Sequence, residues 1–540
     1  MMDGGRDPAR YSGFALLVVV VGVLITAVDT TIVVLALPEI QRSLHVGLSS
    51  VIWVIISYLL VITVLSTQVG RLGDMFGRVR MYEAGFVVFV AGSLACALAF
   101  SELSMILFRV LQGVGGALIT ANSGAVIADT FPKEQRGRAY GFNSIGWNTG
   151  AVLGVLLGGV MVTYVSWRWV FWINVPIGIA AVTVAAKVLA DRGERQRRRL
   201  DGWGMLTLGL GLFGVLWAMV KLTSQSPDPA IAGYFLGGLA LIVAFWAIER
   251  SHPDPMLDLR LFRVPTMTPS LLAASFQSLA NFAVLFLLLM YLQGVRHLTP
   301  IHASLLLVPG YIAGGIVGPF AGRLADRRGP VLPATAGLGI QVLALLAYAQ
   351  FDLGTPLWVV VVAYVVGAIG AGGFFPSNNA AVMKAAPGDK FGIASGLLRT
   401  FANVGMVFSF ALAILIASQS ISKHQAFAIF VGTTTLPTSA DASFTTAIHA
   451  AFYSSTSLML IAAILSATRA QPLHRHRSRP SSRDTKQHPP AIDRPRPSRT
   501  TAIGAGARKR QRHQAPSKPE PSKHANPADA LGKHHERLLR

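Results

Sequence analysis

The chain has 540 residues, of which 52% are hydrophobic and only 13% are charged. Soluble domains carry about 25% charged residues, so the composition excludes an ordinary soluble enzyme and places the chain among membrane proteins. The net charge of +22 is unevenly distributed, because the residues from 468 onward contain 18 Lys and Arg against 5 Asp and Glu. Much of the basicity therefore belongs to the C-terminal end.

Fourteen apolar stretches are long enough to cross a membrane, which takes about 20 mostly apolar residues. In chain order they are 13–36, 50–69, 81–100, 104–127, 139–163, 169–189, 203–221, 231–248, 267–292, 303–321, 331–350, 357–381, 393–417 and 447–467. The alternation of a membrane strand is absent, so we expect an all-α polytopic membrane protein. The first stretch is too long for a signal-peptide core, and we interpret it as a retained helix.

Lys and Arg are distributed asymmetrically over the loops between these stretches. With the N-terminus inside, the inside loops of the core contain 22 Lys and Arg, whereas the outside loops contain five. Cytoplasmic loops of membrane proteins carry the excess of positive charge. Both termini are therefore predicted to be cytosolic.

A short charged motif occurs twice. Residues 70–78 read GRLGDMFGR and residues 322–329 read GRLADRRG, so the copies begin 252 residues apart (322 − 70). Each copy joins two apolar stretches, and we interpret each as a tight loop in which glycine tolerates a positive φ. The duplication indicates two related helix bundles.

A second register supports the duplication. At an offset of 255 the following residues coincide: Gly115 with Gly370, Pro132 with Pro387, Gly137 with Gly392, Gly141 with Gly396, Asn148 with Asn403, and Gly150 with Gly405.

The motif at 70–78 resembles the helix 2–3 signature of the major facilitator superfamily, with an echo at 322–329. The resemblance implies cytosolic loops that help the protein to switch between outward and inward states, rather than to bind substrate. The residues assigned to this switch are Gly70, Asp74, Gly77, Arg78, Asp129, Gly322, Asp326 and Gly329.

The expected architecture is two six-helix bundles with two extra helices between them. The bundles cover 11–190 and 251–467, and the region 191–250 holds a cytosolic basic segment and the inserted pair. Residues 418–446 form a long outside loop. Residues 468–540 lack apolar periodicity, so we interpret them as a disordered basic cytosolic tail. The tail either contacts anionic lipid, binds nucleic acid without sequence preference, or has no dedicated partner.

Ionisable groups inside a bilayer are costly and therefore suggest function. Asp29 begins the run DTTIVVLALP and Arg109 begins the run RVLQGVGG; they resemble the helix 1 and helix 4 signatures of the fourteen-helix drug:proton antiporters of the EmrB/QacA type. The two residues lie about 10 Å and about 8 Å from the outer ends of their helices. If the helices pack together, the proton affinity of Asp29 depends on conformation, and the pair is the candidate proton-coupling site. The alternative is a static ion pair that only fixes packing.

Three glycines in the fifth apolar stretch, Gly150, Gly154 and Gly158, repeat at four-residue spacing, which lets helices approach closely. They resemble the antiporter signature, although Val155 stands where that signature has Pro. Residues 167–178 resemble another signature of the same group, and we interpret them as a Trp-rich interface belt.

Polar residues inside the apolar stretches either line a central cavity or make hydrogen bonds between helices. The candidates for the cavity are Gln112, Asn148, Gln277, Asn281, Arg399 and Asn403.

No phosphate-binding GxxxxGK[ST] loop occurs, and GLGLFG at 209–214 lies in an apolar stretch without the strand and turn of a dinucleotide site. The single cysteine, Cys96, suggests no thiol metal site. We therefore expect a non-enzyme without cofactor or metal.

The resemblance implies a monomeric plasma-membrane transporter that uses the proton-motive force to export amphipathic, cationic or lipophilic compounds, as in multidrug resistance. Its partners would be small molecules, protons and the bilayer, with no specific nucleic acid. The alternatives are an exporter of one endogenous metabolite or lipid, and a non-transporting membrane receptor or scaffold. The buried Asp29 and Arg109 disfavour the scaffold, because a scaffold needs no titratable group in the bilayer.

Overall fold

The described residues form helices throughout, as the apolar stretches predict. The computed structural model describes residues 8–46, 48–131, 133–189, 200–224, 227–253, 255, 257, 259–386, 391–417 and 441–469. The basic run 192–199, residues 418–440 of the predicted outside loop and the tail from 470 onward lie outside these residues. The prediction of a loop is wrong for 441–446, which already belong to the last helix.

The helices are named by the predicted division of the chain, with α1 to α8 called the first half, α9 and α10 the inserted pair, and η1 to α17 the second half. The first half contains α1 (Pro8–Leu44), α2 (Leu48–Val51), α3 (Trp53–Phe76), α4 (Arg78–Ala97), α5 (Glu102–Thr130), α6 (Lys133–Tyr164), α7 (Trp169–Trp172) and α8 (Asn174–Val188). The inserted pair is α9 (Gly202–Ser224) and α10 (Pro229–Ser251). The second half contains η1 (Leu259–Arg263), α11 (Met267–Met290), η2 (Tyr291–Val295), α12 (Pro300–Arg328), α13 (Val331–Tyr348), α14 (Leu357–Ala385), α15 (Phe391–Ala417) and α17 (Asp441–Ala467).

Each of the fourteen predicted stretches coincides with a helix or, in the sixth, with the pair α7 and α8. Within the described ranges, twelve helices are long and apolar enough to cross a membrane, and α3 as one bent span would make thirteen. The described part of α15 contributes a shorter apolar helix, Ile393–Ser409. The all-helical membrane fold is therefore confirmed, whereas the count of fourteen spans stays a prediction.

The bend in α3 lies beside a serine that bonds back into its own helix. Its parts Trp53–Ser66 and Gln68–Phe76 meet at 55°. The Ser66 hydroxyl donates a hydrogen bond to the carbonyl of Ile62 in the preceding turn. Such back-bonding by Ser competes with the helical ladder and often bends helices.

The interpretation of both charged motifs as loops is wrong for most of their length. α3 continues to Phe76 and α12 continues to Arg328, so each motif is largely helical. The reversal is confined to Gly77, with φ +109°, and to Gly329, with φ +89°. Glycine adopts these values without the strain that a Cβ would bring. The other residues of each motif extend the helix instead.

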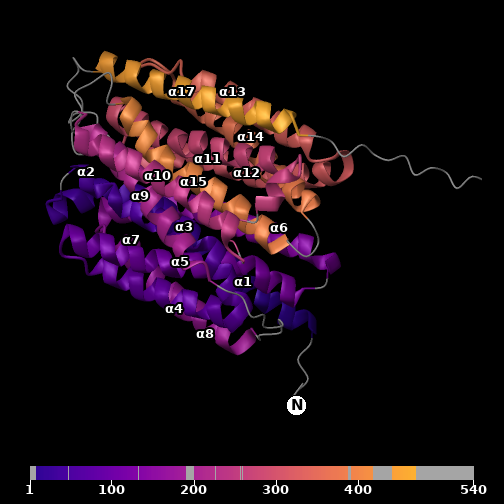
Figure 1. The fold of residues 1–540 in the computed structure, drawn as a ribbon. Helices are drawn as coiled ribbons and strands as arrows, with labels where there is room; N and C mark the ends of the chain where they lie inside the picture. The colour runs from indigo at the N-terminus through magenta and orange to yellow at the C-terminus, as the bar shows by residue number, and fades with distance from the viewer. Residues whose placement is uncertain are drawn as a thin grey trace, which may run out of the picture. The chain divides into compact units, whose positions relative to one another are not determined.

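The two halves repeat the same packing. The helix pairs α1 with α6 and α4 with α5 correspond to α11 with α15 and α13 with α14. In Figure 1 the indigo and violet helices of the first half lie together below, and the rose-to-yellow helices of the second half lie together above. α9 packs against both α3 and α15, so the inserted pair borders both halves.

Candidate functional site

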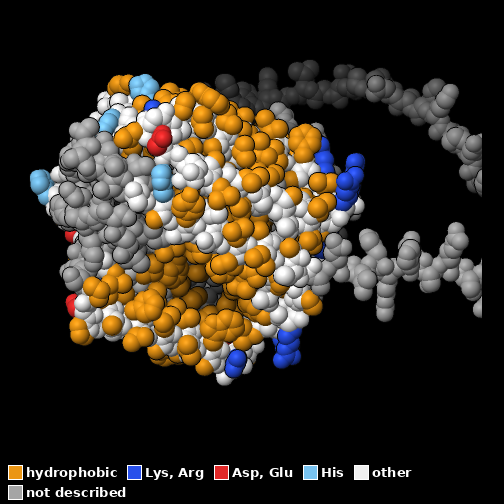
Figure 2. Space-filling model, turned by 90° about the horizontal axis from the view of Figure 1, so that it is seen from above, with side chains coloured by type: hydrophobic (Ala, Val, Ile, Leu, Met, Phe, Trp, Pro, Cys, Tyr) orange, Lys and Arg blue, Asp and Glu red, His pale blue; other side chains and the backbone are white. Residues whose placement is uncertain are grey.

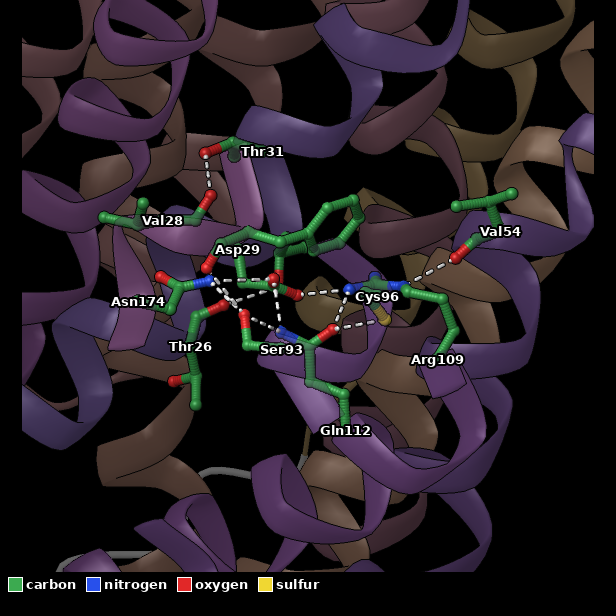
Figure 3. Close-up of polar contacts among 12 residues, drawn as sticks. Thr26, Val28, Asp29, Thr31, Val54, Ser93, Cys96, Arg109, Gln112 and Asn174 are labelled. Carbon is green, nitrogen blue, oxygen red and sulfur yellow. Dashed lines mark hydrogen bonds and ion pairs between the residues drawn. The ribbon is translucent and has the colours of Figure 1, made fainter. Parts of the chain in front are cut away.

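A buried ion pair joins α1 to α5 in the first half. The Asp29 side chain is 0% exposed and the Arg109 side chain 1% exposed. Nη1 of Arg109 donates a hydrogen bond of 2.7 Å to Oδ2 of Asp29 (Figure 3). The structure therefore brings together the two charges that the sequence placed at matching depth.

Three further polar side chains surround the carboxylate of Asp29. Nε2 of Gln112, on α5, donates to Oδ1 of Asp29 at 2.8 Å, and Nδ2 of Asn174, on α8, donates to the same oxygen at 3.3 Å. Both amides also donate to the hydroxyl of Ser93 on α4, at 3.2 and 3.1 Å. We call Asp29, Ser93, Arg109, Gln112 and Asn174 the Asp29 cluster.

The guanidinium of Arg109 is held on its other side by α3. Its Nε donates to the main-chain oxygen of Val54 at 2.8 Å. Its Cζ lies 4.1 Å from the centre of the Tyr58 ring, in a cation–π contact. A buried charge is tolerated only where it is paired and hydrogen-bonded, and these contacts meet that condition for Arg109.

Glycines set the position of α1, which carries Asp29. A Cβ on Gly150 would lie 2.5 Å from the main-chain oxygen of Leu24, and a Cβ on Gly154 would lie 2.0 Å from Oγ1 of Thr31. A Cβ on Gly158 would lie 3.0 Å from Leu35. The three predicted packing glycines therefore all face α1. α6 approaches α1 closely even though Val155 stands where the antiporter signature has Pro.

The Asp29 cluster ties four helices together. Asp29 on α1 accepts hydrogen bonds from one cation and one amide of α5 and from one amide of α8. Ser93 on α4 accepts from the same two amides. Any movement of α1 relative to α5 must therefore break contacts of this buried carboxylate.

Ser93 and Asn174 were missed by the sequence reasoning. Residues 167–178 were interpreted as an interface belt, but Asn174 is fully buried in the Asp29 cluster and Trp167 is only 2% exposed. Trp169, at 52% exposed, fits the belt interpretation. An Asn that interrupts an apolar helix was the available signal, since buried amides require partners.

The first charged motif forms a compact ion cluster. Nη2 of Arg78 donates to Oδ1 of Asp74 at 2.9 Å, and its Nη1 donates to Oδ1 of Asp129 at 2.6 Å. The structure therefore joins Asp74 at the end of α3, Arg78 at the start of α4 and Asp129 at the end of α5. These side chains are 20 to 30% exposed.

The second motif is looser. Oδ1 of Asp326 lies 3.6 Å from Nζ of Lys384, and the side chains are 74% and 49% exposed. Lys384 stands 255 residues after Asp129 (384 − 129), so the duplicated position carries the opposite charge. Gly70 and Gly322 lie within α3 and α12, and neither has a positive φ.

The candidate cavity residues do not share one environment. Gln112 belongs to the Asp29 cluster, and Gln277 is fully buried, where its Nε2 donates to Oε1 of Gln341 at 3.0 Å. Both lie in the packed interior, where each amide nitrogen donates a hydrogen bond to another buried side chain. Asn148 is exposed, whereas Asn281, Arg399 and Asn403 are partly exposed.

One face of the molecule is hollowed and bordered mainly by hydrophobic side chains (Figure 2). Lys and Arg gather mostly at one end of this face, with His, Asp and Glu towards the other. Among the described residues, no group of three His, Cys, Asp or Glu side chains is placed to hold a metal ion.

Comparison with known proteins places the chain in a family. The model described as Major Facilitator Superfamily matches residues 19–410 and 270–507. The tetracenomycin C resistance and export protein of Streptomyces glaucescens is 29% identical over 75% of this chain and 76% of its own length. The riboflavin transporter RibZ of Clostridioides difficile is 27% identical over 77% of this chain and 91% of its own length.

The fold is also similar to a solved structure. A bacterial homologue of the human lysosomal transporter Spinster, in an inward-facing and unoccupied conformation, superposes with a TM-score of 0.59. The match covers 87% of this chain and 100% of the solved chain. The sequence identity is 16%, so the match shows a similar fold only.

Proposed function

The chain belongs to the Major Facilitator Superfamily of membrane transporters, and we propose that it exports amphipathic compounds across the plasma membrane in exchange for protons. The similarity to a resistance and export protein supports export as the direction of transport. A non-transporting receptor or scaffold fits neither the family nor the buried ion pair. We propose that the protein acts as a monomer with both termini in the cytosol, an orientation supported by the excess of Lys and Arg in the predicted inside loops of the sequence.

The observation that carries the proposal is the Asp29 carboxylate, which is fully buried and bound by Arg109, Gln112 and Asn174. Among the described residues of the first half, Asp29 is the carboxylate that is buried inside a helix, and Arg109 is its charge partner. In the proposed mechanism Asp29 carries the proton, and a rearrangement that separates α1 from α5 accompanies its exchange.

A proton gradient supplies enough energy for this exchange. One charge moving down 100 mV releases about 2.3 kcal/mol. At about 1.4 kcal/mol per tenfold, this sustains a roughly 50-fold solute gradient. The absence of a phosphate-binding loop from the sequence is consistent with a gradient, rather than ATP, as the energy source.

The test measures export of a lipophilic fluorescent dye by inverted membrane vesicles at constant ATP, before and after addition of a protonophore. We expect dye accumulation to fall to the level of vesicles that lack the protein. Accumulation that continues unchanged after the gradient is gone contradicts proton coupling.

A second candidate is export of a single endogenous metabolite, because one relative is a riboflavin transporter. A competition panel in the same vesicles separates the two. Many chemically unlike competitors should inhibit a multidrug exporter, whereas only close analogues of one compound should inhibit a metabolite exporter.

A further inference from the structure

The beginning of α3 holds Arg109 on the side away from Asp29 (Figure 3). Nε of Arg109 donates a hydrogen bond of 2.8 Å to the main-chain oxygen of Val54, the second residue of α3. The ring of Tyr58, one turn further along, has its centre 4.1 Å from Cζ of Arg109. The ion pair with Asp29 fixes the guanidinium from the other side. A shift in the first turns of α3 would therefore shift Arg109.

This part of α3 is weakly secured by its own chain. α2 ends at Val51 and α3 begins at Trp53, so the helix is interrupted at Ile52. Ile52 is the N-cap residue of α3, and its side chain makes no capping hydrogen bond. A helix start without a capping side chain is less stable than one that has a Ser, Thr, Asp or Asn cap. The position of the first turn of α3 therefore depends on the side chains that pack against it.

The inserted pair provides such packing. The Trp53 side chain is 5% exposed and contacts two aromatic rings of α9. The centre of its ring lies 5.1 Å from that of Phe213 and 5.4 Å from that of Trp217. Phe213 and Trp217 also stack on each other, with ring centres 5.6 Å apart. Aromatic pairs at such distances stabilise a contact beyond the area that they bury, so α9 holds the residue next to the carbonyl that binds Arg109.

We propose that Trp53 is a positioning residue for Arg109, and that the inserted pair regulates the coupling site by holding the start of α3. The connection runs from the rings of α9 to Trp53, along the main chain to Val54, and through the Val54 carbonyl to Arg109. This proposal rests on the transport function proposed above, and it assigns to the inserted helices a role in regulating that site.

A second aromatic contact of the inserted pair provides the matched control. Trp246 of α10 packs against Phe262 of η1, with ring centres 5.8 Å apart. This contact joins the inserted pair to the second half, whereas Trp53 belongs to the first. If the aromatic contacts only stabilise the fold, removing either should have the same kind of effect. If Trp53 positions Arg109, only the removal of Trp53 should alter proton coupling.

The first test measures energetic coupling between Trp53 and Arg109 and needs no transport. Thermal unfolding of the purified full chain is followed for Trp53→Ala and for Trp246→Ala. Each substitution is made in the wild type and in a neutral background, Asp29→Asn with Arg109→Gln, which removes both charges of the ion pair. Substitutions that act through a shared contact are not additive.

We expect Trp53→Ala to lower Tm in the wild type, and to lower it by about half as much or less in the neutral background, because the contact between Arg109 and Val54 is already lost there. Trp246→Ala should lower Tm equally in both. If Trp53→Ala does not give folded protein, Phe213→Ala takes its place, since it removes one of the two ring contacts of Trp53.

The second test compares two kinds of transport of a rhodamine dye in proteoliposomes. One is uptake driven by a proton gradient, and the other is exchange of labelled for unlabelled dye at equal pH, which needs no net movement of protons. Trp53→Ala should slow the driven uptake about fivefold, as weakening of a hydrogen bond to a charged group allows, and should change the exchange less than about twofold. Trp53→Phe keeps an aromatic ring and should retain most of the driven uptake. Trp246→Ala should leave both rates close to those of the wild type.

Two results overturn the proposal. One is an equal fall in Tm when Trp53→Ala is made in the wild type and in the neutral background. The other is an equal loss of driven uptake and exchange in Trp53→Ala. Energetic coupling between Trp53 and Arg109 in a protein that shows no gradient-driven uptake supports the positioning role and counts against the transport function alone.

Discussion

The two halves of the molecule share their packing but differ in the polar groups that they bury. A Cβ on Gly150 would lie 2.5 Å from a main-chain oxygen of α1, and a Cβ on its repeat partner Gly405 would lie 2.1 Å from a main-chain oxygen of α11. Gly115 and its partner Gly370 likewise leave no room for a Cβ against α4 and α13. The duplicated glycines thus perform the same packing role twice.

The buried polar groups have diverged. The first half buries the Asp29 cluster, whereas the second half buries the neutral pair Gln277 and Gln341. Within the part of the chain that the structure describes, Oε1 of Gln277 and Nε2 of Gln341 have no hydrogen-bond partner. Among the described residues of the second half, no Asp or Glu side chain is buried. The difference indicates that packing was retained in both halves, whereas of the two halves only the first has a buried carboxylate among the described residues.

The largest expected effect comes from the carboxylate that distinguishes the halves. Asp29→Asn keeps the shape of the side chain but cannot exchange the proton, so gradient-driven export should be abolished. Loss of one partner from a buried ion pair should also lower the unfolding free energy by about 3–5 kcal/mol. Proton release on substrate binding to the purified protein, at several pH values, is the decisive measurement.

The matched control for this variant is the neutral pair of the second half. Gln277→Leu combined with Gln341→Leu removes two buried amides together, which can be nearly neutral for stability, and should leave coupled transport intact. If Asp29→Asn releases as many protons as the wild type, the coupling site lies elsewhere.

The shared packing can be tested at the repeated glycines. Gly150→Ala and Gly405→Ala each place a methyl group against main-chain atoms that cannot move alone, so each should destabilise the protein by about 1–3 kcal/mol. Thermal unfolding of the purified protein measures both. Gly315→Ala is the control, because nothing lies within 4 Å of its Cβ position. If the loss of stability differs greatly between Gly150→Ala and Gly405→Ala, the two glycines do not have equivalent packing roles.

Each half buries an arginine, and the two arginines differ in how their charge is compensated. Arg469, just after α17, is 3% exposed and donates from Nη2 to Oδ1 of Asn378 at 2.5 Å, whereas its Nε and Nη1 have no hydrogen-bond partner among the described residues. Burial lowers the pKa of Arg469 to about 10. A base with a lowered pKa in the folded state destabilises the fold at all pH values below that pKa, and this cost is relieved only as the pH rises through about 10.

Replacing Arg469 should therefore stabilise the protein. Arg469→Gln removes the buried charge and keeps an amide that can bond to Asn378. At about 1.4 kcal/mol per pKa unit, we expect a gain of about 1–3 kcal/mol in the unfolding free energy at neutral pH. The same measurement on Arg109→Gln should show a loss, because Arg109 is paired with Asp29. A loss of stability in both variants would contradict the expected difference between the unpaired Arg469 charge and the ion-paired Arg109.

The smallest expected effect concerns the two charged motifs. Asp74 takes part in the ion cluster with Arg78, whereas Asp326 is 74% exposed beside Lys384. Exposed ion pairs contribute about 0–1 kcal/mol. Asp74→Asn should slow turnover about fivefold at unchanged substrate affinity, and Asp326→Asn should change it less than about twofold. Single-turnover transport measures the rate, and dye binding measures the affinity. A larger loss of turnover in Asp326→Asn than in Asp74→Asn would contradict the predicted difference between the two motifs.

The sequence by itself determined the helical membrane fold, the duplication and the candidate ion pair. Long apolar runs have one stable solution in a bilayer, because a helix satisfies every main-chain hydrogen bond within the segment. The repeated glycines and the motifs at 70–78 and 322–329 located the halves. The rarity of charge inside a spanning helix was enough to single out Asp29, Arg109 and Arg399.

Only the tertiary structure decided which of these residues meet. Asn174 and Ser93 are distant from Asp29 in the sequence. Asn174 bonds to Asp29 directly, and Ser93 is linked to it through Asn174, because α8 packs against both α1 and α4. The helical extent of the charged motifs was also hidden, because one glycine with a positive φ replaces the expected loop. The bridge from Arg399 to Thr120 joins helices of different halves. The spacing of apolar and polar residues within one segment predicts which residues share a face of that helix. Which helices come into contact depends on how they pack, and the sequence pattern of one segment does not contain that information.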